Sequence, residues 1–214
     1  MGKRRRVSNL LALTMLSVLT TRPMHPYEIA SVLRAWGKDQ DQKIKWGTLY
    51  TVVQNLAKHG LIEAAETVQQ GGRPERTVYR ITDAGRAELA DWVRELVAVP
   101  EREVPKFKAA LSELGVLGPD EATSLLRERL QTLEEQLAGD REALAGYTRE
   151  LPRLFLIPQE YDLAIREAEA AWLRSFVQEL TDGTLPDMDL WRAYHDTGVM
   201  PPELTELQER GTTG

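Results

Sequence analysis

The sequence predicts a mainly α-helical protein in which three short helices and a β-hairpin precede a set of longer helices. Three observations lead to this fold class. Apolar residues recur at helical spacing along most of the 214-residue chain. Two short strand-like segments flank a turn rich in glycine, and the second half carries a heptad-like apolar repeat. The predicted architecture is an N-terminal winged helix-turn-helix, made of three helices and a β-hairpin wing, followed by an all-helical dimerisation domain.

The predicted organisation has three parts. They are a winged-helix domain with a linker helix in residues 1–99, a helical dimerisation domain in residues 100–182, and a loosely structured tail in residues 183–214. Pro100 ends the helix before the first boundary, and Gly183 ends the helix before the second. The tail mixes proline, glycine and charged residues, which is typical of loosely packed chain ends.

Three short helices are predicted at the N-terminus. The run Leu10–Leu19 is too densely apolar for a surface helix, so we expect it to be buried on most sides. A second helix begins at Pro26, because proline suits the first helical position. A third extends from about Trp46 to His59, and Gly60 stops it.

A β-hairpin and another helix follow. Residues 61–68 and 77–81 are the strands, and residues 69–76 form a glycine-led, basic tip. Thr82 is the expected cap of the next helix, with Trp92 on its apolar face.

The second half carries a seam of apolar residues that alternate steps of four and three. Such a seam is typical of paired helices, and we expect Asp140 to be a buried polar member that sets the register. Tyr161, Trp172 and Phe176 share an apolar stripe on the helix that Pro158 begins. The predicted dimerisation residues are Leu126, Leu130, Leu133, Leu137, Leu144, Tyr147, Leu151, Trp172 and Phe176. The seam can pair two chains, or it can pack within one chain against the Tyr161–Leu180 helix.

Several classes of protein are excluded by composition and motif. The chain has no cysteine, so it has no disulfide, thiolate metal site or cysteine nucleophile. Its histidines, His25, His59 and His195, are far apart in sequence and form no metal-ligand pair. No phosphate-binding glycine loop or nucleophile elbow is present. We therefore predict no enzyme activity, no metal site and no cofactor.

The N-terminus superficially imitates a signal peptide, because basic residues precede an apolar run. Thr14 and Ser17 interrupt this run, no cleavage site of small residues follows, and the run is too short to span a bilayer. We therefore expect a cytoplasmic protein without a membrane segment.

Charge is distributed unequally along the chain. The net charge is -6, but residues 1–80 hold 13 basic and 6 acidic residues, net +7. The remainder holds 14 basic and 27 acidic residues, net -13. A basic end attracts phosphate, so this asymmetry favours a nucleic-acid-binding module joined to an acidic module.

The third helix and the hairpin tip provide the candidate DNA-binding residues. On the helix, the face opposite Leu49, Val52 and Leu56 carries amide, hydroxyl and basic groups that suit base edges and phosphates. At the tip, two arginines flank Pro74, where a minor groove or phosphates can receive them. These residues, with lysines from the preceding loop, are Lys43, Lys45, Thr51, Gln54, Asn55, Lys58, Arg73 and Arg76.

Several strings resemble the PadR family of winged-helix regulators. They are His25-Pro26-Tyr27-Glu28-Ile29, Gly47-Thr48-Leu49-Tyr50, Gly60-Leu61-Ile62, Gly72-Arg73-Pro74 and Tyr79-Arg80-Ile81-Thr82-Asp83-Ala84-Gly85. The second half is similar in architecture to the helical, virulence-activator-like C-terminal domain of the larger PadR subgroup. By matching position, the resemblance adds Tyr27, Thr48 and Tyr50 to the DNA-facing set.

The resemblance implies a sequence-specific transcriptional repressor. Its homodimer would bind a pseudo-palindromic DNA operator, and a small, often aromatic effector would release it. A further hypothesis is that five aromatic residues line an effector cavity, and the alternative is that they are core residues; they are Trp92, Phe107, Tyr161, Trp172 and Phe176. The rival function is a protein–protein interaction module that assembles through its helical domain without specific DNA binding.

Overall fold

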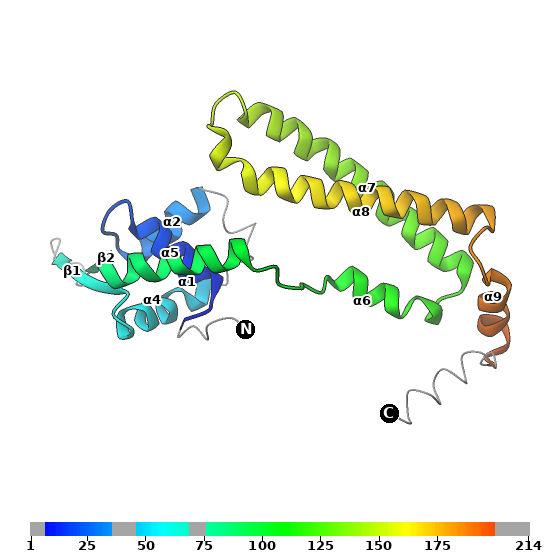
Figure 1. The fold of residues 1–214 in the computed structure, drawn as a ribbon, viewed down its shortest axis with the longest axis horizontal. Helices are drawn as coiled ribbons and strands as arrows, with labels where there is room; N and C mark the ends of the chain where they lie inside the picture. The colour runs from blue at the N-terminus through cyan, green and yellow to red at the C-terminus, as the bar shows by residue number, and fades with distance from the viewer. Residues whose placement is uncertain (1–6, 36–45, 69–75, 200–214) are drawn as a thin grey trace. The chain divides into compact units, whose positions relative to one another are not determined.

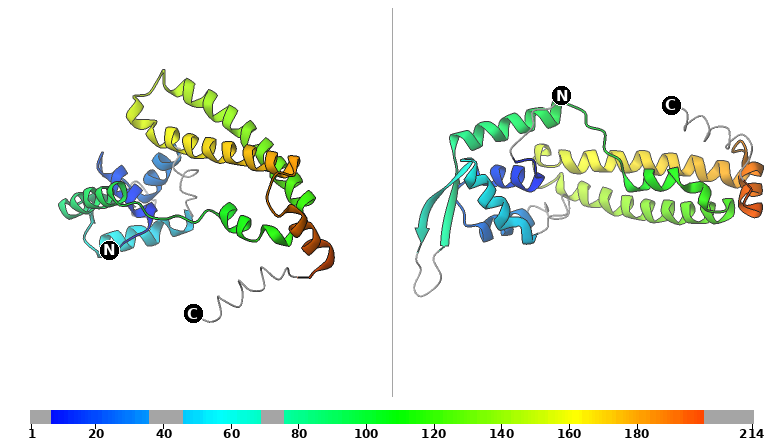
Figure 2. Two further views of the ribbon diagram at one scale, coloured as in Figure 1. Left: turned by 45° about the vertical axis from the view of Figure 1, so that its right-hand side comes forward. Right: turned by 90° about the horizontal axis from the view of Figure 1, so that it is seen from below.

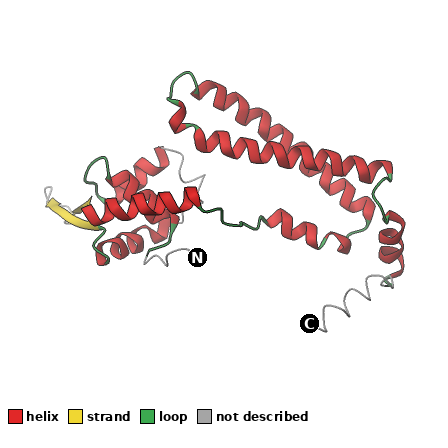
Figure 3. Cartoon of the chain, viewed as in Figure 1, coloured by secondary structure: helices red, strands yellow, loops and turns green. Residues whose placement is uncertain are grey.

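The computed structural model describes residues 7–35, 46–68 and 76–199, and its secondary structure is mainly helical with one small sheet (Figures 1 and 3). The chain divides between Glu103 and Val104 into two compact units. The first unit holds helices α1 (Leu10–Leu19), α2 (Pro26–Ala35), α4 (Leu49–Lys58) and α5 (Asp83–Ala98), with a 3-10 turn, η1 (Trp46–Thr48), directly before α4. Strands β1 (Ile62–Val68) and β2 (Arg76–Ile81) lie between α4 and α5.

The two strands form the predicted antiparallel hairpin. Ile62 lies opposite Ile81, and the register shifts between Ala64 and Glu66. Met24 adds a short bridge at the edge, since its N–H and C=O both exchange hydrogen bonds of 2.9 Å with Tyr79. This bridge connects the segment before α2 to the sheet.

Helices α1, α2, α4 and α5 of the first unit share an apolar core. As predicted, α1 is buried on most sides, because seven of its ten residues are buried. Leu16, Ile29 and Leu56 from three different helices are fully buried in this core, and Trp92 joins them from α5. The core therefore fixes α4 against the rest of the unit.

The end of α4 and the start of α5 are connected by hydrogen bonds between the Thr82 side chain and the backbone. Gly60 adopts a left-handed conformation with φ 67°, which ends α4 where the sequence predicts. The Thr82 hydroxyl donates to the carbonyl of Gly60 at 2.7 Å and accepts from the N–H of Gly85 at 3.0 Å. Thr82 is thus the predicted cap of α5, and it also attaches that helix to the turn after α4.

The second unit is built on a helical hairpin. Helices α7 (Pro119–Tyr147) and α8 (Ile157–Asp182) lie side by side and antiparallel (Figures 1 and 2). The shorter elements are α6 (Lys106–Ser112), η2 (Leu114–Val116), η3 (Arg153–Phe155) and α9 (Met188–Thr197). Apolar residues from α7 and α8 form a core of their own: Leu126, Leu133, Leu137, Ala170, Leu173, Val177 and Leu180.

Three details of the second unit differ from the sequence prediction. Asp140 is not buried, because its side chain is about half exposed and pairs with Arg166 of α8. Leu151 lies beyond the end of α7, in a turn that precedes Pro152. The segment predicted as a loose tail contains α9, and its Trp191 indole donates to the carbonyl of Leu117 at 2.9 Å.

Candidate nucleic-acid interface

Helix α4 has one buried and one exposed face. Leu49, Val52, Val53 and Leu56 are buried, as the helical pattern predicts. The exposed face carries Tyr50, Thr51, Gln54, Asn55 and Lys58, and Thr48 is exposed just before the helix. No acidic residue occurs between Leu49 and Lys58, so this face presents hydrogen-bonding and basic groups without a carboxylate that would repel phosphate.

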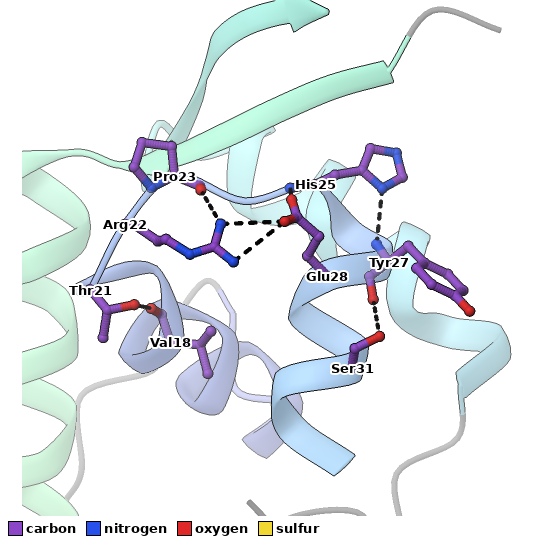
Figure 4. Close-up of polar contacts among 8 residues, drawn as sticks. All are labelled: Val18, Thr21, Arg22, Pro23, His25, Tyr27, Glu28 and Ser31. Atoms are coloured by element: carbon purple, nitrogen blue, oxygen red, sulfur yellow. Dashed lines mark hydrogen bonds and ion pairs between the residues drawn. The ribbon is translucent and has the colours of Figure 1, made fainter. Parts of the chain in front are cut away.

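A network of polar contacts fixes the start of α2 (Figure 4). The N–H of His25 donates to Glu28 Oε2 at 2.9 Å, and the N–H of Tyr27 donates to His25 Nδ1 at 3.1 Å. These bonds satisfy backbone donors at the helix start in the manner of a capping box. Arg22 donates to Glu28 Oε1 at 3.3 Å. The Tyr27 side chain remains 67% exposed next to this network.

The capping network shifts the acidity of Glu28. The hydrogen bond from the His25 N–H, together with the nearby Arg22 guanidinium, holds the pKa of the Glu28 carboxyl below its ordinary value of 4.5. Both effects favour the carboxylate over the protonated acid. Ionised Glu28 therefore stabilises the start of α2 and the chain segment that carries Tyr27.

Glu28→Ala is expected to lower the free energy of unfolding at neutral pH by about 1 kcal/mol, because the cap is lost and the half-exposed ion pair adds little. Since the folded pKa is depressed, the carboxylate's contribution is complete above pH 4.5 and disappears as the pH falls through the folded value. Urea denaturation of both proteins across this range measures the difference, which should shrink at acid pH.

Glu63→Ala is the matched control for this prediction. Glu63 accepts from Arg80 at 2.7 Å on the exposed surface of the hairpin and caps no helix. Its loss should change stability by less than about 0.5 kcal/mol. A Glu28→Ala effect as small as that of the control would contradict a capping role.

The basic residues around the hairpin tip and the loop before α4 are only partly described. Lys43, Lys45 and Arg73 lie outside the described residues, and Arg76 is the first residue of β2. The strand register nevertheless puts Arg76 opposite Val68, at the end of the hairpin next to the tip. Tyr27, α4 and this hairpin belong to the same compact unit.

The predicted dimerisation residues fall into two groups. Leu126, Leu133 and Leu137 are buried against α8 of the same chain, which is the intramolecular arrangement that the seam allows, and Leu130 is half-buried. These leucines therefore form the hairpin core. Tyr147, Leu151 and Trp172 are about half exposed, and Leu144 and Phe176 are half-buried.

One face of α8 exposes a row of large apolar side chains. Tyr161, Ile165 and Trp172 are 69%, 53% and 46% exposed, and they are spaced by four and seven residues. This spacing puts them on one side of the helix, and the buried Ala170, Leu173 and Val177 occupy another. We call Tyr161, Ile165 and Trp172 the exposed row.

The five aromatic residues considered for an effector cavity are divided between the two units. Trp92 is buried in the core of the first unit, and Phe107, Trp172 and Phe176 form a cluster in the second. In the part of the chain that is described, no group of three or more His, Asp or Glu residues could hold a metal ion. No helix among those residues is long and apolar enough to cross a membrane.

Three structurally important features were not predicted. Met24 carries the edge bridge to β2, and Gly85 packs closely against the turn after α4. The third is the cap formed by His25 and Glu28. Only the cap has a sequence signal, because a glutamate three residues after the capping position is typical of a helix start.

Comparison with known proteins places the first unit in a family. The profile of the family described as "Transcriptional regulator PadR-like family" matches residues 15–91, from within α1 to α5. The negative transcriptional regulator PadR of Bacillus subtilis is 27% identical over 128 residues, which cover 60% of this chain and 69% of that relative.

Solved structures share the fold. Bacillus subtilis PadR in complex with operator DNA is 21% identical with a TM-score of 0.65, and the same protein in complex with p-coumaric acid is 20% identical with a TM-score of 0.66. Each match covers 80% of this chain and 99% of the other. The Vibrio cholerae virulence activator AphA is 24% identical with a TM-score of 0.61, over 80% and 98% of the two chains.

Proposed function

Since this chain belongs to the PadR-like family of transcriptional regulators, we propose that it is a homodimeric repressor of a pseudo-palindromic DNA operator. Members of this family are transcriptional regulators and not enzymes, in agreement with the sequence prediction. We further propose that a small aromatic effector releases the DNA, and that the protein acts in the cytoplasm. The exposed face of α4 carries the proposal.

The proposed DNA contacts divide into two kinds. Gln54 and Asn55 can pair with the edge of adenine in the major groove, and Thr51 can meet a thymine methyl group. Thr48, Tyr50, Lys58 and Tyr27 have hydroxyl or ammonium groups that suit phosphate oxygens. Lys43, Lys45, Arg73 and Arg76 add basic groups from the loop and the wing. The first kind provides sequence preference, and the second provides salt-dependent affinity.

The proposed dimer uses the exposed row on α8. Large exposed apolar side chains along one side of a helix favour an interaction surface, and a two-fold contact buries the same residues on both chains. Leu126, Leu133 and Leu137 are already buried within the chain, so we do not include them in this surface. Two linked chains would present two α4 helices to successive half-sites.

The proposed effector is a small aromatic acid. This proposal rests on the B. subtilis relative, whose structure is described as a complex with p-coumaric acid. An effector of this kind releases DNA only if it binds one conformation of the dimer better than the other.

Titration of duplex DNA from upstream of the protein's own gene tests the proposed function. At low salt we expect specific binding, and raising the salt from 50 to 200 mM should weaken it about 100-fold or more. Gln54→Ala/Asn55→Ala should remove about 100-fold of the preference over random duplex, because two base contacts are lost. Arg73→Ala/Arg76→Ala should weaken binding to the specific and the random duplex alike. It should also reduce the slope of log affinity against log salt concentration by about 2.

Gln131→Ala is the control, because Gln131 is an exposed glutamine on α7 that pairs only locally with Glu135. It should bind DNA as the wild type does. Binding that shows neither sequence preference nor salt dependence would favour the rival function, a protein–protein interaction module.

A further inference from the structure

We propose that Phe107 of α6 is a positioning residue for the dimer surface, acting through Trp172. This inference rests on the proposed homodimer and adds to it a link between α6 and the pairing of two chains. Its basis is a cluster of three aromatic rings in the second unit that connects α6 to α8.

Trp172 belongs to both the cluster and the exposed row. Its indole stacks on Phe176 with the ring centroids 5.1 Å apart and the planes inclined by 24°. The Phe107 ring approaches it edge to face at 6.3 Å and 72°. Trp172 is still 46% exposed, so its indole contacts α6 on one side and is accessible on the other.

Phe107 is itself held from a second direction. The Arg129 guanidinium of α7 lies 3.7 Å from the centroid of the Phe107 ring, a cation–π contact. Glu169 of α8 fixes this guanidinium by accepting from Arg129 Nε at 2.9 Å. The ring therefore lies between a guanidinium anchored across the hairpin and the indole of Trp172.

Few other contacts hold α6 in place. It has seven residues, none of them buried, and no side-chain hydrogen bond caps its start. Phe107 and Leu111 are its half-buried contacts with the core of the hairpin. Because so much of its attachment passes through the aromatic cluster, the position of the Trp172 indole and the docking of α6 depend on each other.

The consequence is a thermodynamic linkage. If a second chain covers the exposed row, it fixes Trp172 and thereby favours docked α6. By reciprocity, removing the Phe107 ring, which frees the Trp172 indole on its α6 side, weakens the dimer, although Phe107 is not a member of the row. Leu111 lacks the ring contact with Trp172, so it offers a matched control on the same helix.

A double-mutant cycle on the full-length protein tests the inference. The dimer dissociation constant is measured by sedimentation equilibrium for wild type, Phe107→Ala, Trp172→Leu and the double variant, with Leu111→Ala as control. We expect Phe107→Ala to weaken the dimer about tenfold in the wild-type background and less than twofold in the Trp172→Leu background. Leu111→Ala should stay within about twofold of wild type. Hydrogen exchange of the α6 amides should also be slower above the dimer dissociation constant than below it.

Two results would overturn the inference while leaving the proposed dimer intact. One is a Phe107→Ala dimer as tight as the wild type. The other is a Phe107→Ala effect that is equally large in the Trp172→Leu background and is matched by Leu111→Ala. This result would indicate that undocking of α6 weakens the dimer without acting through Trp172. A wild type that stays monomeric at all concentrations would refute both the proposed homodimer and the linkage.

Discussion

Gly85→Ala is expected to destabilise the first unit by about 3 kcal/mol, because the added methyl group has no space. A Cβ at this position would lie 2.0 Å from the carbonyl oxygen of Leu61 and 2.8 Å from Cγ1 of Ile81. The first of these atoms belongs to the backbone, so a change of side-chain rotamer cannot relieve the overlap. The N-terminus of α5 and the turn after α4 would have to move apart.

That movement would also break hydrogen bonds. The Leu61 carbonyl accepts from the N–H of Thr82 at 3.1 Å, and the Thr82 hydroxyl bridges Gly60 and Gly85. For a unit of this size, a loss of about 3 kcal/mol corresponds to a fall in melting temperature of roughly 15 °C, which calorimetry would detect.

Gly47→Ala is the matched control in the same unit. Among the described residues, no atom lies within 4 Å of a Cβ built on Gly47, so the melting temperature of this variant should change by no more than about 3 °C. If Gly85→Ala melted as the control does, the close approach of Leu61 to Gly85 would not be a constraint in solution.

Gly85 also shows which features of this fold a local sequence pattern does not predict. The string Thr82-Asp83-Ala84-Gly85 belongs to the family pattern, and the residue type of Thr82 predicts the helix cap that the structure confirms. A glycine is required here because the backbone carbonyl of Leu61 lies close to position 85. Leu61 is 24 positions earlier in the chain, so no local sequence pattern includes both residues. Local signals therefore predict where a helix starts, but they do not predict which backbone will pack against it.

The same distinction applies to the helices. The two faces of α4 follow from residue spacing alone, and the structure confirms them. The sequence also predicts the apolar seam of α7. It does not predict which helix packs against the seam, because any complementary apolar helix satisfies a heptad pattern. Helix α9 is absent from the sequence prediction because its packing depends on long-range contacts, among them the bond from Trp191 to the carbonyl of Leu117 and the ion pair of Arg192 with Asp120. At the candidate site, the sequence predicts which polar residues lie on the exposed face of α4. The contacts of these residues with DNA stay predictions.

Ile165→Asp is expected to abolish the proposed dimer at micromolar concentration. Ile165 is 53% exposed in the middle of the exposed row, between Tyr161 and Trp172. A two-fold contact there would bury one carboxylate from each chain without a partner, and like charges would oppose each other. Within a single chain the same aspartate remains in water, so the monomer should keep its fold. Light scattering reports the mass, and circular dichroism reports the fold.

Loss of the dimer should also lower operator affinity by about 100-fold or more, since the two half-sites would no longer be bound by linked helices. The residues on α4 are unchanged in this variant, so any loss comes from the linkage and not from base contacts. Val116→Asp is the matched control, because Val116 is 77% exposed on η2, outside the exposed row, and should leave mass and affinity unchanged. If the Ile165→Asp protein were still dimeric, the dimer interface would have to lie elsewhere on the molecule. A monomeric variant with full operator affinity would show that one α4 helix is sufficient for recognition.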